Sequence, residues 1–112
     1  MNIHCIYITA GDMKEARAVG KAIVSEMLAA CVNIIDSVQS IYWWQGEIQD
    51  DREVLLIAKT KESLVPQLVE KVKSVHSYEC PCVVSLPIAD GNKEFLKWVE
   101  KETRPGKISN PK

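Results

Sequence analysis

Potential metal ligands lie close together near residue 80, where the chain carries His76, Glu79, Cys80 and Cys82. Neutral imidazole is the commonest ligand for copper and zinc, carboxylates also bind metals, and thiolates are the soft ligands that Cu(I) prefers. Alternate side chains of an extended segment point the same way, so Cys80 and Cys82 are a candidate pair of Cu(I) ligands. These residue types make the segment a candidate metal site.

Each of these residues also has a purely structural interpretation. His76 stands at the end of a predicted helix, where its side chain can interact with the last carbonyl groups. Cys31, a further candidate ligand, begins a predicted strand, where a free cysteine behaves as a small hydrophobic residue. The cysteines lack the paired Cys-x-x-Cys or matching histidine spacing of a zinc site. Spacing alone therefore leaves both interpretations open.

A second group of residues mixes aromatic and charged side chains, namely Trp44, Lys59, Tyr78 and Glu79. Such a mixture suits a cleft that binds a small ligand, and the boundary between subunits is a common place for one. The alternative for Trp44 and its neighbour Trp43 is packing in a subunit interface, where aromatic residues are enriched. Lys59 can equally pair with an acidic residue. Both interpretations of this group stay open.

The N-terminal part of the chain predicts a strand followed by a helix. Residues 3–9 are rich in β-branched and aromatic types and end at a Gly-containing turn. Asp12 begins the helix, and Glu15 three residues later resembles the second member of a capping box. Apolar residues of this helix recur at steps of three and four: Ala16, Val19, Ile23, Met27 and Ala30. One face of the helix is therefore expected to be buried.

A long β-hairpin is predicted next. Residues 31–44 and 47–59 are β-forming and flank Gln45 and Gly46, and Gly46 supplies the positive φ that a tight turn needs. The segment 54–58 is apolar on both faces and should lie centrally in a sheet, whereas the residues before it are polar. The hairpin is thus expected to project at its tip and to be buried at its base.

A second helix, a last strand and a closing helix complete the predicted order. Ser63 is expected to cap the second helix, with Pro66 in its first turn and its end near His76. Its apolar face is Leu64, Leu68, Val72 and Val75. Residues 82–88 predict the strand, and residues 92–103 predict the helix. The closing helix is expected to use Phe95, Leu96 and Val99 as its apolar residues.

This order is β-α-β-β-α-β with an extra C-terminal helix, which predicts an α+β fold of the ferredoxin-like sandwich type. Both crossover helices then cover one face of the sheet and leave the other face open. Tyr42, Trp43 and Trp44 add more apolar surface than a monomer should leave in water, so self-association is expected. The apolar periodicity of the sequence does not give the number of subunits.

Length and composition limit the classes of function. A chain of 112 residues forms one domain, predicted over residues 1–104 with 105–112 as a short C-terminal tail. Its net charge of -1 argues against a nucleic-acid partner. Apolar runs of about five residues are too short to span a membrane, and no signal peptide is evident. We therefore expect a cytoplasmic protein whose cysteines are reduced.

Five motifs are similar to those of the CutA divalent-cation-tolerance family. They are residues 30–33 (ACVN), 42–47 (YWWQGE), 56–60 (LIAKT), 76–81 (HSYECP) and 96–98 (LKW). The resemblance covers residues 3–103. It implies a ferredoxin-like subunit in a tight homotrimer that binds copper or another divalent cation, with no obligatory cofactor and no established catalysis. The candidate metal ligands are then His76, Cys31 and Glu79.

The chain also departs from the family's pattern. Ser77 and Cys82 stand where the family often has Pro and Glu. Bacterial copper-binding members have cysteines in the first strand and second helix, where this chain has Ile8 and Lys71. The family's metal site therefore does not transfer as a whole.

Three classes of function are compared. The leading hypothesis is a trimeric protein of divalent metal tolerance that binds copper and is not an enzyme. The alternative is a small-molecule sensor or assembly scaffold that resembles the PII-type trimers, with ligand clefts between subunits. Acylphosphatases share the architecture, but they need a phosphate cradle after the first strand, and Asp12 in that loop would repel phosphate. An enzyme is thus disfavoured.

Overall fold

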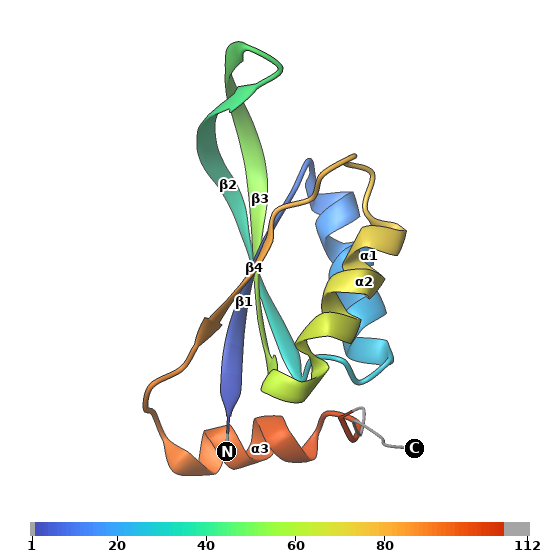
Figure 1. Ribbon diagram of the computed structural model, residues 1–112, viewed down its shortest axis with the longest axis vertical. Helices are drawn as coiled ribbons and strands as arrows, with labels where there is room; N and C mark the ends of the chain where they lie inside the picture. The colour runs from blue at the N-terminus through green and yellow to red at the C-terminus, as the bar shows by residue number, and fades with distance from the viewer. Residues whose placement is uncertain (1, 107–112) are drawn as a thin grey trace.

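The computed structural model describes residues 2–106 and shows an α+β fold in which a four-stranded antiparallel sheet carries three α-helices (Figure 1). The elements are β1 (Ile3–Ala10), α1 (Met13–Ser25), β2 (Cys31–Trp44), β3 (Glu47–Lys61), a 3-10 turn (Glu62–Leu64), α2 (Val65–Val75), β4 (Val83–Pro87) and α3 (Lys93–Lys101). The predicted order of strands and helices is confirmed. Of the predicted tail 105–112, only Pro105 and Gly106 belong to the described residues.

The sheet has the strand order β2-β3-β1-β4, and every pair of neighbours is antiparallel. Helices α1 and α2 lie side by side on one face, and α3 lies across the end of the sheet near the N-terminus (Figure 1). The opposite face keeps apolar side chains in solvent: Val84 and Leu86 of β4 are 49% and 52% exposed, and Ile35 of β2 is 46% exposed. This chain alone therefore leaves one sheet face uncovered.

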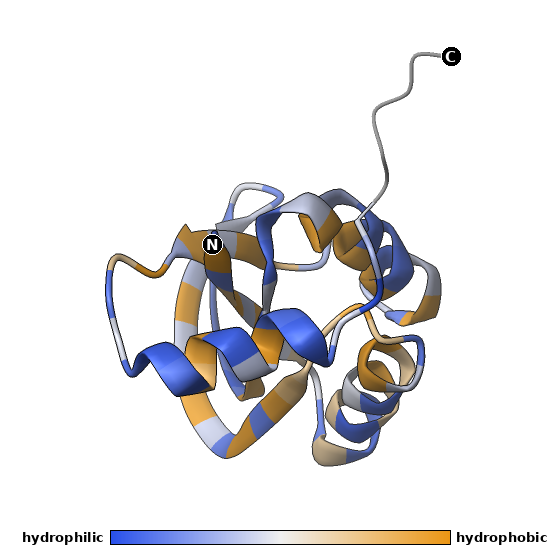
Figure 2. Cartoon of the chain, turned by 90° about the horizontal axis from the view of Figure 1, so that it is seen from below, coloured by the Kyte–Doolittle hydropathy of each residue, from blue (hydrophilic) through white to orange (hydrophobic). Residues whose placement is uncertain are grey.

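The core lies between the sheet and the helices α1 and α2. Alternate residues of β1 and β3 face inward, because successive side chains of a strand point to opposite faces. The fully buried members include Ile6, Ile8, Leu56, Ala16, Val19, Ile23, Leu68 and Val72. Figure 2 looks along the strands and shows hydrophobic residues in the sheet and along each helix, interleaved with hydrophilic ones. Each large core side chain contributes about 1.5–3 kcal/mol by its burial.

The first helix ends earlier than its apolar spacing predicts. The last helical residue is Ser25, and Met27 has a φ of 57°. The Leu28 N–H donates to Ile23 O at 2.9 Å and the Met27 N–H to Val24 O at 2.9 Å, which is the Schellman arrangement that closes many helices. Met27 is 45% exposed and Ala30 follows the turn, so neither belongs to the buried helical face.

The second helix begins differently from the prediction. A 3-10 turn over Glu62–Leu64 precedes it, the N-cap residue is Leu64, and no side chain of the described residues caps it. Ser63 is therefore not the cap, whereas Pro66 does lie in the first turn. Two apolar residues also prove exposed, Val75 at 39% and Phe95 of α3 at 41%.

The hairpin of β2 and β3 projects beyond the other strands (Figure 1). Pairing between β1 and β3 stops at Ala10 and Val54, so within this chain residues 47–53 pair with β2 only. Gln45 and Gly46 have φ of 50° and 82°, as a two-residue type I′ turn requires. A bulge at Ser37, whose φ is 80°, shifts the register between Asp36 and Val38.

None of the helices in residues 2–106 is long and apolar enough to cross a membrane.

Candidate functional site

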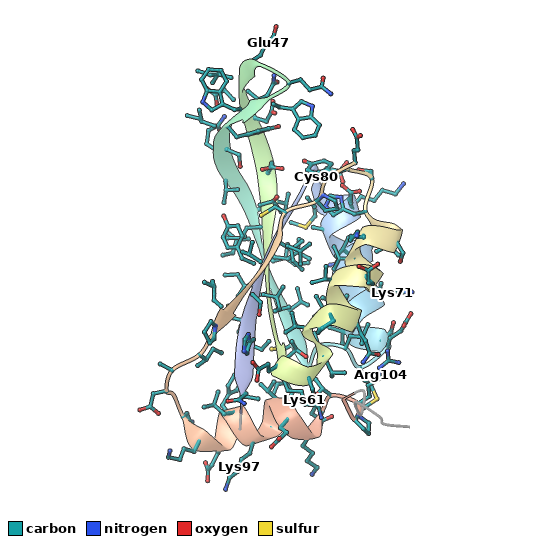
Figure 3. All side chains as sticks on the ribbon, in the orientation of Figure 1. Glu47, Lys61, Lys71, Cys80, Lys97 and Arg104 are labelled. Carbon is teal, nitrogen blue, oxygen red and sulfur yellow. The ribbon has the colours of Figure 1, made fainter. Side chains whose placement is uncertain are left out.

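A cleft of about 700 Å³ opens where the projecting hairpin leaves the sheet. One wall belongs to β1 and the hairpin, and the other belongs to the segment between α2 and β4, in which Cys80 lies (Figure 3). Its lining residues are Tyr7, Thr9, Gln39, Ser40, Ile41, Tyr42, Trp44, Glu53, Tyr78, Glu79, Cys80 and Cys82. The volume is within the range of sites that bind small ligands.

His76 fixes the segment between α2 and β4 against the first strand. Its side chain is fully buried, and its Nε2 lies 2.8 Å from the carbonyl oxygen of Thr9. Its Nδ1 lies 3.1 Å from the backbone N–H of Tyr78, which donates to it. Nδ1 is thus the acceptor, and Nε2 carries the proton that Thr9 accepts. Both ring nitrogens are occupied, so a metal would have to displace one of these hydrogen bonds.

Glu15 of α1 holds the same segment from the helix side. Its Oε2 accepts from the Ser77 N–H at 2.6 Å, and its Oε1 accepts from the Gly11 N–H at 3.3 Å. Asp12 caps α1 as predicted, because its Oδ1 accepts from the Glu15 N–H at 2.8 Å. The Glu15 carboxylate, however, bonds Gly11 and Ser77 and not the N-cap N–H of a capping box. It therefore connects α1 to the wall of the cleft.

The Glu15→Gln substitution is expected to destabilise the fold at neutral pH and to lose this effect in acid. Burial alone raises the pKa of Glu15, but the hydrogen bonds from Ser77 and Gly11 and the nearby His76 outweigh it, so its pKa is lowered from 4.5. A carboxylate with a lowered folded-state pKa adds stability above its unfolded pKa, and this stability is lost as pH falls through the folded pKa.

At a fixed protein concentration, the melting temperature of Glu15→Gln should therefore be lower than that of wild type at neutral pH. The two melting temperatures should converge well below pH 4.5. Glu100→Gln, at an exposed position of α3, is the control and should change little at either pH. A gap between wild type and Glu15→Gln that is as wide in acid as at neutral pH would contradict the role assigned to the ionised carboxylate.

Tyr78 connects the loop to a buried carboxylate of β3. Its hydroxyl donates to Glu53 Oε2 at 2.7 Å, and Glu53 is only 6% exposed. Burial, and then the hydrogen bond to Glu53, raise the pKa of Tyr78 far above its ordinary value. The ring packs on His76 with centroids 4.6 Å apart. The phenol lies close to the start of α1, since a Cβ at Gly11 would be 3.4 Å from the Tyr78 hydroxyl oxygen.

The hairpin supplies two further aromatic residues of the cleft, Tyr42 and Trp44, and β1 supplies Tyr7. The Tyr42 hydroxyl donates to Asp51 Oδ2 at 2.7 Å, and this hydrogen bond raises the pKa of Tyr42. Trp44 lines the same cleft and is 41% exposed. A second hairpin contact, from the Gln39 amide to Asp50 at 2.8 Å, ties the two strands together. Cross-strand pairs of this kind hold the aromatic wall in place.

The structure brings together three of the four residues predicted to line a ligand cleft. Trp44, Tyr78 and Glu79 line one cleft within this chain. Lys59 is not among the lining residues: it lies opposite Cys31 in the sheet and donates to the Asn33 side chain. Lys59 is six residues from Glu53 along β3, a separation of about 20 Å. A position of this cleft between subunits stays a prediction.

The three predicted metal ligands are not brought together within one chain. Cys31 is half buried beside Lys59, where burial raises the pKa of its thiol, whereas Glu79 is exposed at the cleft. Across residues 2–106 no three His, Cys, Asp or Glu side chains form a group that could hold a metal ion. Cys80 and Cys82 are free and exposed in the same cleft, and partial burial raises the pKa of the Cys82 thiol.

Sequence reasoning did not identify Glu53 or the role of Glu15 at this cleft. One signal was available for Glu53, which is a single acid directly before the apolar run Val54–Ala58 and so stands at the edge of a buried segment. Its partner Tyr78 is 25 residues away, and this contact gives no local signature.

Comparison with known proteins identifies the relatives of this chain. A family model described as CutA1 divalent ion tolerance protein matches residues 4–102. The divalent-cation tolerance protein CutA of Thermus thermophilus is 48% identical over 98 residues, which make up 88% of this chain and 95% of that protein. Protein CutA 1, chloroplastic, of Oryza sativa is 46% identical over 99 residues, or 88% of this chain and 56% of that protein.

A solved structure shows the same likeness. The crystal structure of CutA1 from Oryza sativa superposes with a TM-score of 0.90 at 43% identity and covers 93% of this chain and 95% of that chain. The present chain thus spans almost the whole Thermus relative and little more than half of the full rice protein.

Proposed function

This chain belongs to the CutA1 divalent ion tolerance family, and on that premise we propose that it acts in tolerance of divalent metal ions as a homotrimer. It binds the ion, copper being the best candidate, and catalyses no reaction. The relatives' names support this, since they describe divalent-cation tolerance and name no enzymatic activity. A cytoplasmic location and the lack of a nucleic-acid partner are part of the same proposal and rest on composition.

The observation that carries the copper assignment is the donor set of the cleft. Glu79, Cys80 and Cys82 all line it. Thiolates are the soft ligands that reduced copper, Cu(I), prefers. Because no three donors in residues 2–106 form a group, a second subunit or solvent has to complete the coordination of the ion. His76 and Cys31 stay candidate ligands, but His76 would have to give up a buried hydrogen bond.

Two features of the subunit support a trimer. The strand order β2-β3-β1-β4 fits the proposed ferredoxin-like sandwich, which leaves one sheet face for a neighbour. The projecting hairpin exposes three large apolar side chains by more than half: Trp43 at 70%, Ile41 at 69% and Ile48 at 62%. Exposed apolar patches of this kind mark interaction surfaces, and a closed ring of subunits would cover both.

Metal binding is tested by equilibrium dialysis of the reduced, chelator-stripped protein against copper under anaerobic conditions, with the bound metal measured by mass spectrometry. We expect saturation at a fixed ratio of ions to chains, because a built site has a defined stoichiometry. The double variant Cys80→Ser/Cys82→Ser and the single variant Glu79→Gln should each bind less tightly. Glu100→Gln on α3 is the matched control for the loss of one carboxylate.

Binding should also fall in acid, because the ligands must lose protons before they coordinate the ion. His76→Ala and Cys31→Ser, assayed alongside, decide whether those two residues contribute. Weak, non-stoichiometric uptake that is equal in wild type and in all variants would contradict the copper proposal and leave the ligand-binding alternative.

That alternative is a small-molecule sensor like the PII-type trimers, and the cleft itself favours it. Its volume of about 700 Å³ and its lining by Trp44, Tyr78 and Glu79 match the predicted ligand site, apart from Lys59. A cleft of this size that combines aromatic walls with polar side chains suits a small organic ligand.

A further inference from the structure

The lining of the cleft carries acids but no basic side chain. Glu53 and Glu79 line it, and among its lining residues in the described part of the chain there is no Lys, Arg or His. A cavity with charge of one sign and low-dielectric walls attracts the opposite charge. The cleft therefore favours a cation over a neutral or anionic ligand.

The buried acid still has one oxygen available. Oε2 of Glu53 accepts from Tyr78, while Oε1 has no hydrogen-bond partner within residues 2–106. No fully buried side-chain oxygen or nitrogen of those residues lacks a partner, so Oε1 keeps some solvent exposure, and Glu53 is one of the residues that line the cleft. A carboxylate oxygen at 6% residue exposure is an acceptor poised for a charged donor.

Four aromatic rings line the same cleft as this acceptor, from Tyr7, Tyr42, Trp44 and Tyr78. The faces of aromatic rings attract cations, and the effect grows as water is removed. Tyr42 and Tyr78 donate their hydroxyl protons to Asp51 and Glu53, so what they offer a ligand is ring faces and oxygen lone pairs. The hydroxyl protons of these two tyrosines are therefore already used and are not free to bind an anionic ligand.

We propose that the cleft binds a small organic ammonium ion, whose N–H groups donate to Glu53 Oε1 and whose apolar body packs on the aromatic rings. This rests on the ligand-binding alternative above and names its ligand class. A bare divalent ion fits this part of the cleft less well, because such an ion needs several oxygen or sulfur donors and no three stand together in the described residues.

Three probes of one shape but different charge test the proposal on the full chain in the presence of a chelator. They are 2-phenylethylamine, 2-phenylethanol and 3-phenylpropanoate, and binding is measured by calorimetry and by tryptophan fluorescence. We expect saturable binding of the amine at least about tenfold tighter than that of the alcohol, since a hydrogen bond between charged groups is stronger than one between neutral groups. The anion should bind weakest, and the preference should shrink at high salt.

Two variants identify which carboxylate of the cleft binds the amine. Glu53→Gln keeps an acceptor for Tyr78 and should weaken amine binding at least about tenfold while leaving alcohol binding unchanged. Glu79→Gln, at an exposed position that cannot impair folding greatly, should weaken amine binding less. Glu100→Gln on α3 is the matched control and should bind like wild type.

The outcomes separate the ligand class from the ligand-binding role. If the amine and the alcohol bind equally, or if both Glu variants bind the amine like wild type, the ammonium proposal is wrong while the cleft still binds ligands. Tighter binding of 3-phenylpropanoate would likewise overturn it. If none of the three probes binds, both the proposal and the small-ligand alternative fail for this cleft.

Discussion

Replacing Trp43 and Ile48 together by Glu is expected to convert the proposed homotrimer into a monomer of 12.6 kDa. The two residues lie directly opposite each other in the hairpin and are 70% and 62% exposed in the single chain. In a trimer that buries them, each contributes about 1.5–3 kcal/mol, and a buried unpaired carboxylate adds a larger penalty. Their outward position leaves the core of the subunit intact, so the monomer should remain folded.

Size-exclusion chromatography with light scattering measures this directly, and circular dichroism checks the fold. Lys14→Glu/Lys97→Glu adds two carboxylates on exposed helical positions and is the control, which should remain trimeric. A wild-type mass of one chain would refute the trimer. A trimeric Trp43→Glu/Ile48→Glu variant would show that the hairpin is not the interface, and the open sheet face with Val84 and Leu86 would then be tested in the same way.

The second large effect concerns His76, for which the structure favours a structural role. His76→Ala should lower the free energy of unfolding by about 3 kcal/mol, because it leaves the Thr9 carbonyl and the Tyr78 N–H without partners and opens a cavity. The wall of the cleft should loosen with it, since His76 is the residue that holds Tyr78 to β1.

Chemical denaturation at one fixed protein concentration measures the effect, because the stability of an oligomer depends on concentration. His4, the other histidine of the chain, is the natural comparison: it is half buried, its Nδ1 lies 2.6 Å from Ser85 Oγ, and His4→Ala should cost about 1 kcal/mol. His76→Gln, which retains a donor and an acceptor, should recover part of the loss. An unchanged unfolding midpoint in His76→Ala would contradict the structural role, and a loss of stoichiometric copper binding without destabilisation would establish His76 as a ligand.

Local signals in the sequence determined the order of the elements. The type I′ turn at Gln45-Gly46 and the cap at Asp12 involve residues within a few positions, so residue type and spacing are enough to predict them. The apolar period of the helices likewise depends on neighbours three and four residues apart. Even so, the apolar spacing predicted too long a helix α1. Ala30 fits this spacing, although the backbone has already turned at Met27.

The tertiary structure alone decided which side chains share the cleft. Its key contacts join residues far apart in the chain: His76 is 67 positions from Thr9, and Tyr78 is 25 positions from Glu53. The register of β3 against β2 places Lys59 beside Cys31 and away from Trp44, although the sequence favoured grouping Lys59 with Trp44. Residue types thus indicated the chemistry that is available, whereas strand register and long-range packing determined which groups meet, because neither leaves a periodic trace in the sequence.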